Sequence, residues 1–569
     1  MIPSSPSARS SDWRQHLWAW LALGLLIVYI RGLFIDLMDV DAAQYAALSM
    51  EMLQGGHWLQ VQYRHVDYLD KPPLLFWSSA ASFALFGLHN WSDKLVSLLA
   101  AGGGVYAVYR FSRLFYAKTT ARNAAFILAS CVGAVLMCND VRTDALLMGL
   151  TVCAVWQVAE HVASGRLKHL LLAGVFAGLA MLTKGPIGLI APGFAVGTHL
   201  LLRRDWRRLF QPRWLFGLAV TAVILLPMCW GLYQQFDQHP EKLVNGRTGV
   251  SGLYFYFWEQ SFGRITGAST WKDNTTLFTF FHVYLWVFLP WPLLFAGALW
   301  RRLRDVVRDG LRIDAGDEAY SLGGFVLTFV ALSLSHYKLP HYIFVTLPWA
   351  AILTARWLAM PAAIGRAWWR TQYFVFAALG AIVLWLLHGV FPPGATLVWI
   401  VVLILFGYLF VLCWRTPFPE RTDLLVQRSV LAALATLVVV NFHFYPNLLP
   451  FQSTVAVPRF VRQAGIPVDK LAYFNRRGPA MDFYAGRVVP EMDTPDQVRE
   501  TAARNGPYWV YTDSGGRARL DSAAVPYTAA AAFQHFEVAQ LTGRFLNHRT
   551  RDKTLQPVYL LKISADDLR

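Results

Sequence analysis

Long apolar stretches recur along most of the chain, and each is near the ~20 residues that a helix needs to cross a hydrocarbon core. The pattern changes after residue 447, where short strand-like runs alternate with one helical segment (494–506). The strand-like runs are LAYF (471–474), RVVPE (487–491), YWVYTD (508–513) and PVYLLKIS (557–564). We therefore expect a polytopic α-helical membrane domain (1–447), followed by a small soluble α/β domain (448–569).

The apolar stretches predict thirteen transmembrane helices. They lie near residues 17–35, 92–110, 122–138, 145–163, 169–186, 187–202, 214–233, 276–300, 319–335, 341–358, 372–390, 395–413 and 428–447. The run at 17–35 is long for a signal peptide, and no A-x-A cleavage site follows it, so we expect an uncleaved first helix.

Composition agrees with a membrane class. The chain of 569 residues is 56% hydrophobic and 15% charged, with a mean hydropathy of +0.38. The net charge of +16 does not indicate nucleic-acid binding, because the basic residues form short clusters between apolar runs. All five cysteines lie within or at the ends of apolar runs, so neither a disulfide framework nor a CxxC metal site is expected.

Lys and Arg are enriched in alternate short loops, which predicts that those loops are cytoplasmic. The clusters include residues 110–122, 166–168, 203–208, 301–312, 366–370 and 415–421. With a cytoplasmic N-terminus, thirteen helices would place the C-terminal domain on the opposite side. The first outer loop is then residues 36–91, and the longest outer loop is 234–275.

The first outer loop carries two carboxylates at the start of an expected helix. Apolar residues recur at helical spacing over 42–53, which favours an amphipathic helix at the interface, ended by Gly55 and Gly56. Asp41 precedes this helix, and an ordinary N-cap is one explanation for it. Asp39, two residues earlier, is not explained by capping, and the two carboxylates together indicate a base or a cation site.

The stretch YLDKPPLLFW (68–77) follows in the same loop. Asp70 and Lys71 could form a salt-bridged turn that opens a helix at the prolines. Alternatively, the Lys71 ammonium at the membrane boundary could bind a phosphate.

Further charged residues occur at other outer helix ends. Asp144 begins one predicted span, Lys184 ends another, and Glu259 lies among aromatics in the longest loop. A lone lysine at a helix end usually extends toward the interface. However, the four cations that return to this face, Lys71, Lys184, Arg264 and Lys338, together indicate an anionic partner.

The order of DAAQYAALSMEML, YLDKPPLLFW, LTKGPIGL, FWEQSFGRITG, FLPW and KLPHYIFVTLP resembles the bacterial GT-C glycosyltransferases of family 39. These include aminoarabinose transferases that modify lipid A and, more distantly, protein O-mannosyltransferases. The resemblance implies a GT-C fold in the bacterial inner membrane with a periplasmic C-terminal domain. It also implies inverting transfer of a sugar from a polyprenyl (undecaprenyl) phosphate donor to lipid A or another periplasmic acceptor.

The resemblance and the residues together suggest roles for individual side chains. Asp41 would deprotonate the acceptor hydroxyl, and Lys71, with Arg264, Lys338 and Lys184, would bind the donor phosphate. No cofactor is specified with certainty, and a divalent metal is a candidate. The residues considered for support or for metal binding are Asp39, Asp70, Asp144, Glu259 and His282, and those considered for a lipid-tail groove are Phe76, Trp77, Phe255 and Trp258. An ordinary interfacial belt explains any one of these aromatics equally simply.

Three alternatives stay open. The acceptor could be a protein hydroxyl or a polysaccharide. The chain could instead be a flippase or transporter of a lipid-linked sugar, although no internal repeat and no polar group at mid-membrane is apparent in the sequence. A structural or assembly partner with an inert site is the third.

Overall fold

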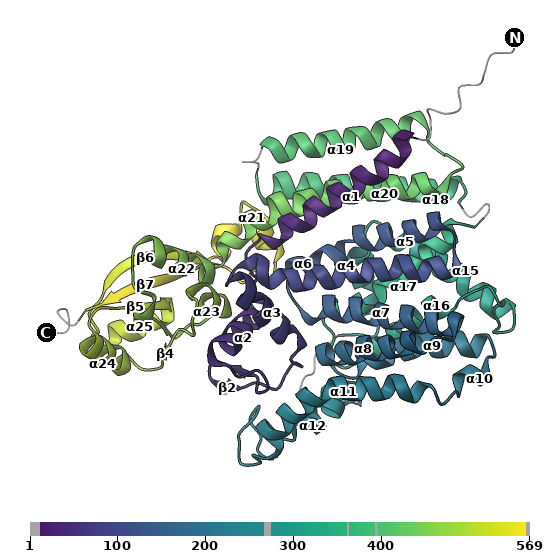
Figure 1. Cartoon of the computed structure of the whole chain (residues 1–569). Helices are drawn as coiled ribbons and strands as arrows, with labels where there is room; N and C mark the ends of the chain where they lie inside the picture. The colour runs from purple at the N-terminus through teal and green to yellow at the C-terminus, as the bar shows by residue number, and fades with distance from the viewer. Residues whose placement is uncertain (1–11, 267–274, 361–363, 393–395, 565–569) are drawn as a thin grey trace, which may run out of the picture.

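The computed structural model describes residues 12–266, 275–360, 364–392 and 396–564. Its apolar helices lie side by side in one bundle, and the β-sheet of the C-terminal part projects from one end of that bundle (Figure 1).

The first half of the chain is helical apart from one short hairpin, β1 (Gln62–Tyr63) and β2 (Val66–Asp67). Its helices are α1 (Asp12–Leu33), α2 (Asp41–Gly55), α3 (Leu74–Phe86), α4 (Asn90–Phe115), α5 (Lys118–Ser130), α6 (Val132–Asn139), α7 (Thr143–Ser164), α8 (Leu167–Lys184), α9 (Ile187–Leu202), α10 (Trp206–Leu209), α11 (Trp214–Leu232), α12 (Gly252–Tyr254) and α13 (Phe262–Thr266).

The bundle is completed by helices from the second half. These are α14 (Thr279–Val287), α15 (Pro292–Arg308), α16 (Tyr320–Ser333), α17 (Leu347–Leu358), α18 (Arg366–Leu384), α19 (Thr396–Arg415), α20 (Thr422–Val439) and α21 (Tyr445–Leu448). A 3₁₀ segment, η3 (Pro340–Thr346), leads into α17.

Every stretch predicted to cross the membrane contains helix. Among the described residues, eight helices are long and apolar enough to cross, or nine if the bent pair α5–α6 counts as one crossing. The shorter apolar helices α3, α9 and α16 add to the bundle. The helical membrane class is thus confirmed, whereas the number of thirteen crossings stays a prediction.

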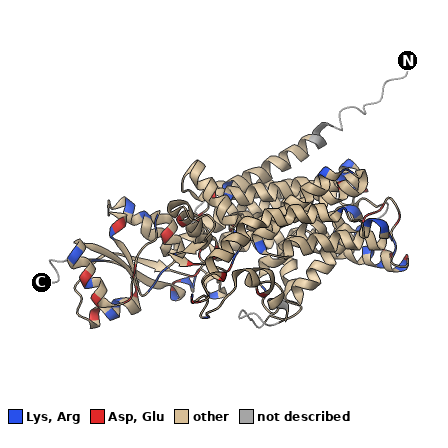
Figure 2. Cartoon of the chain, turned by 60° about the horizontal axis from the view of Figure 1, so that its bottom comes forward, with Lys and Arg blue, Asp and Glu red and all other residues tan. Residues whose placement is uncertain are grey.

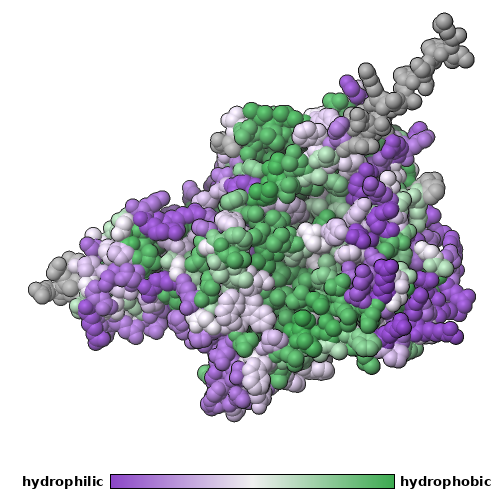
Figure 3. Space-filling view, viewed as in Figure 1, coloured by the Kyte–Doolittle hydropathy of each residue, from purple (hydrophilic) through white to green (hydrophobic). Residues whose placement is uncertain are grey.

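Charge is distributed unevenly along the bundle. Lys and Arg gather at the end remote from the C-terminal part (Figure 2), and hydrophobic residues cover the face of the bundle between its two ends (Figure 3). The basic loops named above thus meet at one end of the molecule, as the charge pattern predicted.

Two predicted spans are not single straight helices. The stretch 122–138 bends by 51° between α5 and α6, and the backbone N–H of Val132 there donates to the carbonyl of Leu289 on another segment. The stretch 276–300 is divided into α14 and α15 around Pro290 and Pro292, because proline has no N–H to continue a helix.

The first outer loop has well-defined helix limits. Gly56 ends α2 in the left-handed conformation (φ 70°), and its N–H donates to the carbonyl of Met52, as expected for glycine at a helix end. Helix α3 starts directly after Pro72 and Pro73. Asp41 is not the cap of α2: Val40 occupies that position, and no side chain caps the helix. The capping explanation of Asp41 is therefore wrong.

The C-terminal part contains a five-stranded sheet with the order β4-β3-β5-β7-β6. Its elements are α22 (Ser453–Gln463), β3 (Leu471–Phe474), α23 (Pro479–Ala485), β4 (Glu491–Met492), α24 (Pro495–Asn505), β5 (Tyr508–Asp513), α25 (Ser514–Ser522), β6 (Thr528–His535), α26 (Gly543–Leu546) and β7 (Gln556–Ile563). Strand β3 pairs in parallel with β4 and β5, whereas β7 is antiparallel to β5 and β6. Strand β6 was not predicted, because its alanines are poor strand formers.

The C-terminal part packs against the first outer loop. Arg64, at the tip of the β1–β2 hairpin, forms an ion pair of 2.6 Å with Asp482. Asp39 accepts hydrogen bonds from the backbone N–H of Ala480 (2.9 Å) and from the hydroxyl of Thr454. The side-chain amide of Gln452 donates to the carbonyl of Leu37 and accepts from the N–H of Asp39. These contacts fix the chain just before α2.

Burial at this contact raises the pKa of Asp39 to about 6. Between these two pKa values, Asp39 is protonated in the folded protein, whereas in the unfolded chain, with an ordinary carboxyl pKa near 3.8, it has lost its proton. The contribution of Asp39 to stability is thus fully present below pH ~4 and decreases as the pH rises toward ~6.

We expect Asp39→Asn to remove this pH dependence, since an amide can accept from Ala480 and donate to Thr454 without carrying charge. Relative to this variant, the wild-type protein should lose about 1–2 kcal/mol of stability between pH 4.5 and 7. Thermal unfolding in detergent across this pH range measures the difference. The exposed Asp469→Asn is the control, and parallel pH profiles for wild type and Asp39→Asn would contradict the assignment.

Candidate active site

A polar cavity of about 170 Å³ lies where α2, α3, α7, α8 and η3 meet. It is lined by charged, aromatic and amide side chains from five chain segments. The lining residues are Asp41, Gln44, Tyr45, Tyr68, Asp70, Lys71, Arg142, Thr143, Asp144, Lys184, Tyr337, Leu339, His341 and Tyr342. Asp41, Lys71, Asp144 and Lys184, which the sequence singled out at separate helix ends, thus meet in one cavity.

Arg142 joins two carboxylates at this site. It forms an ion pair with Asp41 and a second one, through Nε at 2.7 Å, with Asp140. The two carboxylates raise the pKa of Arg142 further above its already high ordinary value, despite opposing desolvation. A guanidinium can bind two carboxylates at once in fixed geometry. Arg142 therefore holds the first turn of α2 against the start of α7.

A second ion pair crosses the cavity floor. The Lys184 ammonium, at the end of α8, lies 2.5 Å from Oδ1 of the buried Asp144 and 4.1 Å from the ring centre of Tyr342. The ring of His341 is placed between the two pairs, with Nδ1 3.4 Å from Arg142 and Nε2 3.8 Å from Asp144. The charges of the cavity are thus paired between different helices.

An apolar cavity of about 180 Å³ adjoins the polar one. The two share Lys71, Lys184 and Tyr342 in their linings. The rest of the apolar cavity is lined mainly by aliphatic and aromatic residues of α7, α9, α13 and α16, namely Leu147, Ile187, Ile190, Phe194, Phe262, Ala331 and Leu332. Two ammonium groups therefore stand at the boundary between a polar and an apolar chamber.

The other two predicted phosphate ligands, Lys338 and Arg264, are not among the described lining residues of either cavity. Lys338 is buried beside the site, 3.4 Å from the hydroxyl of Thr275. Arg264 lies in α13, but its side chain falls outside the described part of the structure. Asp70 lies in the lining and accepts a hydrogen bond of 3.4 Å from Asn245 of the longest outer loop.

Of the five residues considered for support or for a metal, Asp70 and Asp144 line the polar cavity, whereas the other three lie elsewhere. Asp39 contacts the C-terminal part, Glu259 pairs with Arg247 at 2.7 Å, and His282 is exposed on α14. Within the described ranges, no three His, Cys, Asp or Glu side chains form a group that could hold a metal ion.

The aromatics suggested for a lipid-tail groove are also placed elsewhere. Phe76 is fully buried against Tyr45, with ring centres 5.7 Å apart, and Phe255 lies in a separate core. Trp258 is 46% exposed. Trp77 and these three residues are not among the described lining residues of the apolar cavity. Several residues that line it, such as Leu147, Ile190 and Phe194, come from helix interiors, where the sequence offers no polar signal.

Sequence reasoning missed Arg142 and the tyrosines of the polar cavity as site residues. Arg142 stands between Asp140 and Asp144 in the string NDVRTDALLM, and this dense charge at a helix start was the available signal. Tyr45 and Tyr68 resemble ordinary core residues in the sequence, and no local pattern distinguishes them.

Comparison with known proteins identifies the fold. ArnT from Cupriavidus metallidurans, solved bound to undecaprenyl phosphate, has a TM-score of 0.71 at 18% identity, covering 97% of this chain and 98% of that chain. Residues 70–230 match the family described as dolichyl-phosphate-mannose-protein mannosyltransferase. The chain has the GT-C fold, and its resemblance to family 39 is confirmed. It is a multi-pass membrane protein.

Two relatives are similar to this chain over part of its length. The undecaprenyl phosphate-α-4-amino-4-deoxy-L-arabinose arabinosyl transferase of Edwardsiella ictaluri is 29% identical over 352 residues, and that of an Enterobacter species is 26% identical over 348 residues. Each match covers 59% of this chain and 58% of the relative. The chain thus matches less than two thirds of the length of these relatives.

Removing the guanidinium should destabilise the site. We expect Arg142→Gln to lower the free energy of unfolding by roughly 1–3 kcal/mol, because two carboxylates in a largely desolvated site lose their partner. In the double variant with Asp41→Asn the loss should be smaller than the sum of the single losses. Thermal unfolding in detergent measures these differences.

Arg247→Gln provides a matched control, since its pair with Glu259 involves a half-exposed arginine and should contribute only about 0–1 kcal/mol. Additive effects of Arg142→Gln and Asp41→Asn would show that the two side chains are not coupled.

Proposed function

We propose that this chain is an inverting glycosyltransferase that uses a polyprenyl (undecaprenyl) phosphate sugar. The acceptor would be lipid A or another envelope glycolipid at the periplasmic face. The observation that carries the proposal is the boundary between the two cavities at Lys71 and Lys184. A polyprenyl phosphate has the same division, with an anionic head and an apolar tail, and ammonium groups at that boundary match its phosphate.

In the proposed reaction, a hydroxyl of the acceptor attacks the anomeric carbon of the donor sugar. Arg142 engages Oδ2 of Asp41, so Oδ1 is the oxygen we assign to accept the hydroxyl proton. The new carbon–oxygen bond forms opposite the breaking one, which inverts the anomeric centre. The bonding electrons leave with the polyprenyl phosphate, and Lys71 and Lys184 stabilise the charge that develops on it.

The comparisons support the donor class. The Edwardsiella and Enterobacter relatives are named as transferases of an undecaprenyl phosphate-linked aminoarabinose, and the ArnT structure contains undecaprenyl phosphate. The cavity lining around Asp41 and Gln44 is compatible with more than one sugar. The donor sugar is therefore assigned here only as a hexose or pentose.

The proposal includes a membrane orientation. The N-terminus and the basic end of the bundle would be cytoplasmic, and the soluble domain from residue 448 onward would be periplasmic, in the bacterial inner membrane. The cavities lie at the end of the bundle near the C-terminal part, so the reaction would take place on the periplasmic side.

A reconstituted assay tests the proposal. Purified protein in lipid is given a radiolabelled polyprenyl phosphate sugar with lipid A, with a Ser/Thr peptide or with a polysaccharide, and release of polyprenyl phosphate is measured. Transfer to the peptide or polysaccharide would favour the alternative acceptors. Movement of intact donor across the bilayer without transfer would favour a flippase.

Changes at the proposed reacting groups should reduce transfer strongly. We expect Asp41→Asn and Lys71→Ala each to lower kcat by about 100- to 1,000-fold, the range seen when one preorganised polar group is removed from a transition state. The exposed Lys118→Ala, at the opposite end of the bundle, should keep wild-type rates. Unchanged turnover in both active-site variants would sink the catalytic assignment.

A larger side chain in the apolar cavity should weaken binding of the donor tail. We expect Ile190→Trp to raise KM for a long-chain donor by about tenfold, because it fills space that the tail needs, with a smaller effect on a short-chain analogue. An equal effect on both donors would indicate general disruption and would contradict the placement of the tail.

A further inference from the structure

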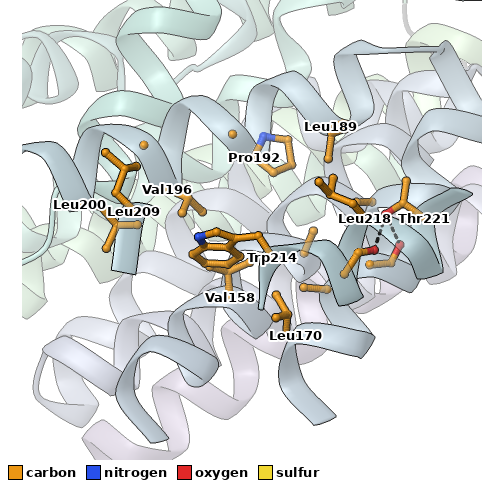
Figure 4. Close-up of a pocket in the computed structure, with 17 residues that line it drawn as sticks. Val158, Leu170, Leu189, Pro192, Val196, Leu200, Leu209, Trp214, Leu218 and Thr221 are labelled. Carbon is orange, nitrogen blue, oxygen red and sulfur yellow. Dashed lines mark hydrogen bonds between the residues drawn. The ribbon is translucent and has the colours of Figure 1, made fainter. Parts of the chain in front are cut away.

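A second apolar groove shares no described lining residue with the proposed active site and runs along α9 toward the basic end of the bundle; Figure 4 shows its lining residues. Its volume is about 290 Å³, and it runs between α9 and α11 over a floor made by α7 and α8. One helical face of α9, from Leu189 through Val196 to Leu200, forms one wall. Trp214 and Leu218 of α11 form part of the other wall.

Two glycines on α9 leave space along one wall of this groove. A Cβ atom at Gly193 or at Gly197, both on the α9 wall, would meet no atom within 4 Å. These glycines therefore do not serve close packing between helices, unlike Gly174 on the floor, whose Cβ would meet the carbonyl oxygen of Gly217 at 2.4 Å. The open space on α9 is available to another molecule.

Five arginines lie in the segment that joins α9 to α11 at one end of the groove. This α9–α11 basic cluster consists of Arg203, Arg204, Arg207, Arg208 and Arg213. It adjoins the groove directly, since Leu209 of α10 lines the groove and the indole of Trp214 donates to the carbonyl of Arg208 at 2.8 Å. Asp205 pairs with Arg208 at 3.1 Å and is the one carboxylate within residues 203–213.

Exposed aromatics stand beside the same cluster. Trp206 is 53% exposed and Phe210 is 75% exposed, as is typical of side chains at the boundary between lipid tails and headgroups. From Leu189 to Leu200 the α9 wall extends about 16 Å at 1.5 Å per residue. This is close to one leaflet, about half of the ~30 Å hydrocarbon core.

The width and length of the groove favour an acyl chain as its occupant. A transmembrane helix is ~10 Å across with its side chains, much wider than an extended hydrocarbon chain. An acyl chain is narrow enough and has the depth of one leaflet. The charge of the cluster requires a negative headgroup.

We propose that this groove binds an anionic glycerophospholipid, with one acyl chain between α9 and α11 and the headgroup phosphate on the α9–α11 basic cluster. The site is distinct from the polyprenyl phosphate site proposed above, and its test does not depend on transferase activity.

The test is native mass spectrometry of the full-length protein, equilibrated in detergent with phosphatidylglycerol or with phosphatidylcholine. Wild-type protein should retain phosphatidylglycerol about tenfold more tightly than phosphatidylcholine. Filling the groove with Gly193→Leu plus Gly197→Leu should abolish this preference. So should reducing the charge with Arg204→Gln plus Arg207→Gln, which leaves the groove itself intact.

Matched controls separate the site from general effects. Gly407→Leu fills an equally open glycine position on α19, and Arg304→Gln plus Arg312→Gln removes two exposed arginines at the same end of the bundle. Both should retain phosphatidylglycerol within about twofold of wild type. Equal retention of the two lipids, unchanged retention in the arginine variant, or displacement of phosphatidylglycerol by polyprenyl phosphate at equal concentration would overturn the proposal.

Discussion

The ion pairs of Arg142 are the interaction on which the candidate site depends. This guanidinium binds Asp41 at the start of α2 and Asp140 just before α7. In an apolar bundle, a carboxylate without such a partner would be costly to bury. The same requirement applies to Asp144, which pairs with Lys184 of α8. Pairing charges between helices thus orders the polar cavity as the bundle packs.

The position of the site follows from where helices end. Asp41 begins α2, the prolines at 72 and 73 precede α3, and Gly185 ends α8 directly after Lys184. Because these ends lie on the same side of the bundle, their polar residues share one chamber, while the helix interiors beside it line an apolar one. One chain thereby provides an amphipathic space that suits a lipid-linked substrate.

The C-terminal part contributes to the site through the backbone. Asp39 accepts from Ala480 and Thr454, and Gln452 holds the backbone of Leu37 and Asp39. Asp41 lies two residues further along and is held in turn by Arg142. The C-terminal part therefore fixes the same short segment that carries the proposed base.

Hydropathy alone determined the helical membrane class, the sheet-bearing C-terminal part and most helix limits, because these depend on local periodicity and on glycine and proline. Strand β5 coincides with the predicted run 508–513. The motifs also indicated Asp41, Lys71, Asp144 and Lys184. Only the tertiary structure decided their partners: Arg142 is 101 residues from Asp41, and Asp39 meets residues more than 400 positions away. Likewise, none of the four candidate tail aromatics is among the described lining residues of the apolar cavity, although Trp258 stacks on Phe262, which lines it. Contacts over such separations depend on how the helices pack, which local sequence patterns do not encode.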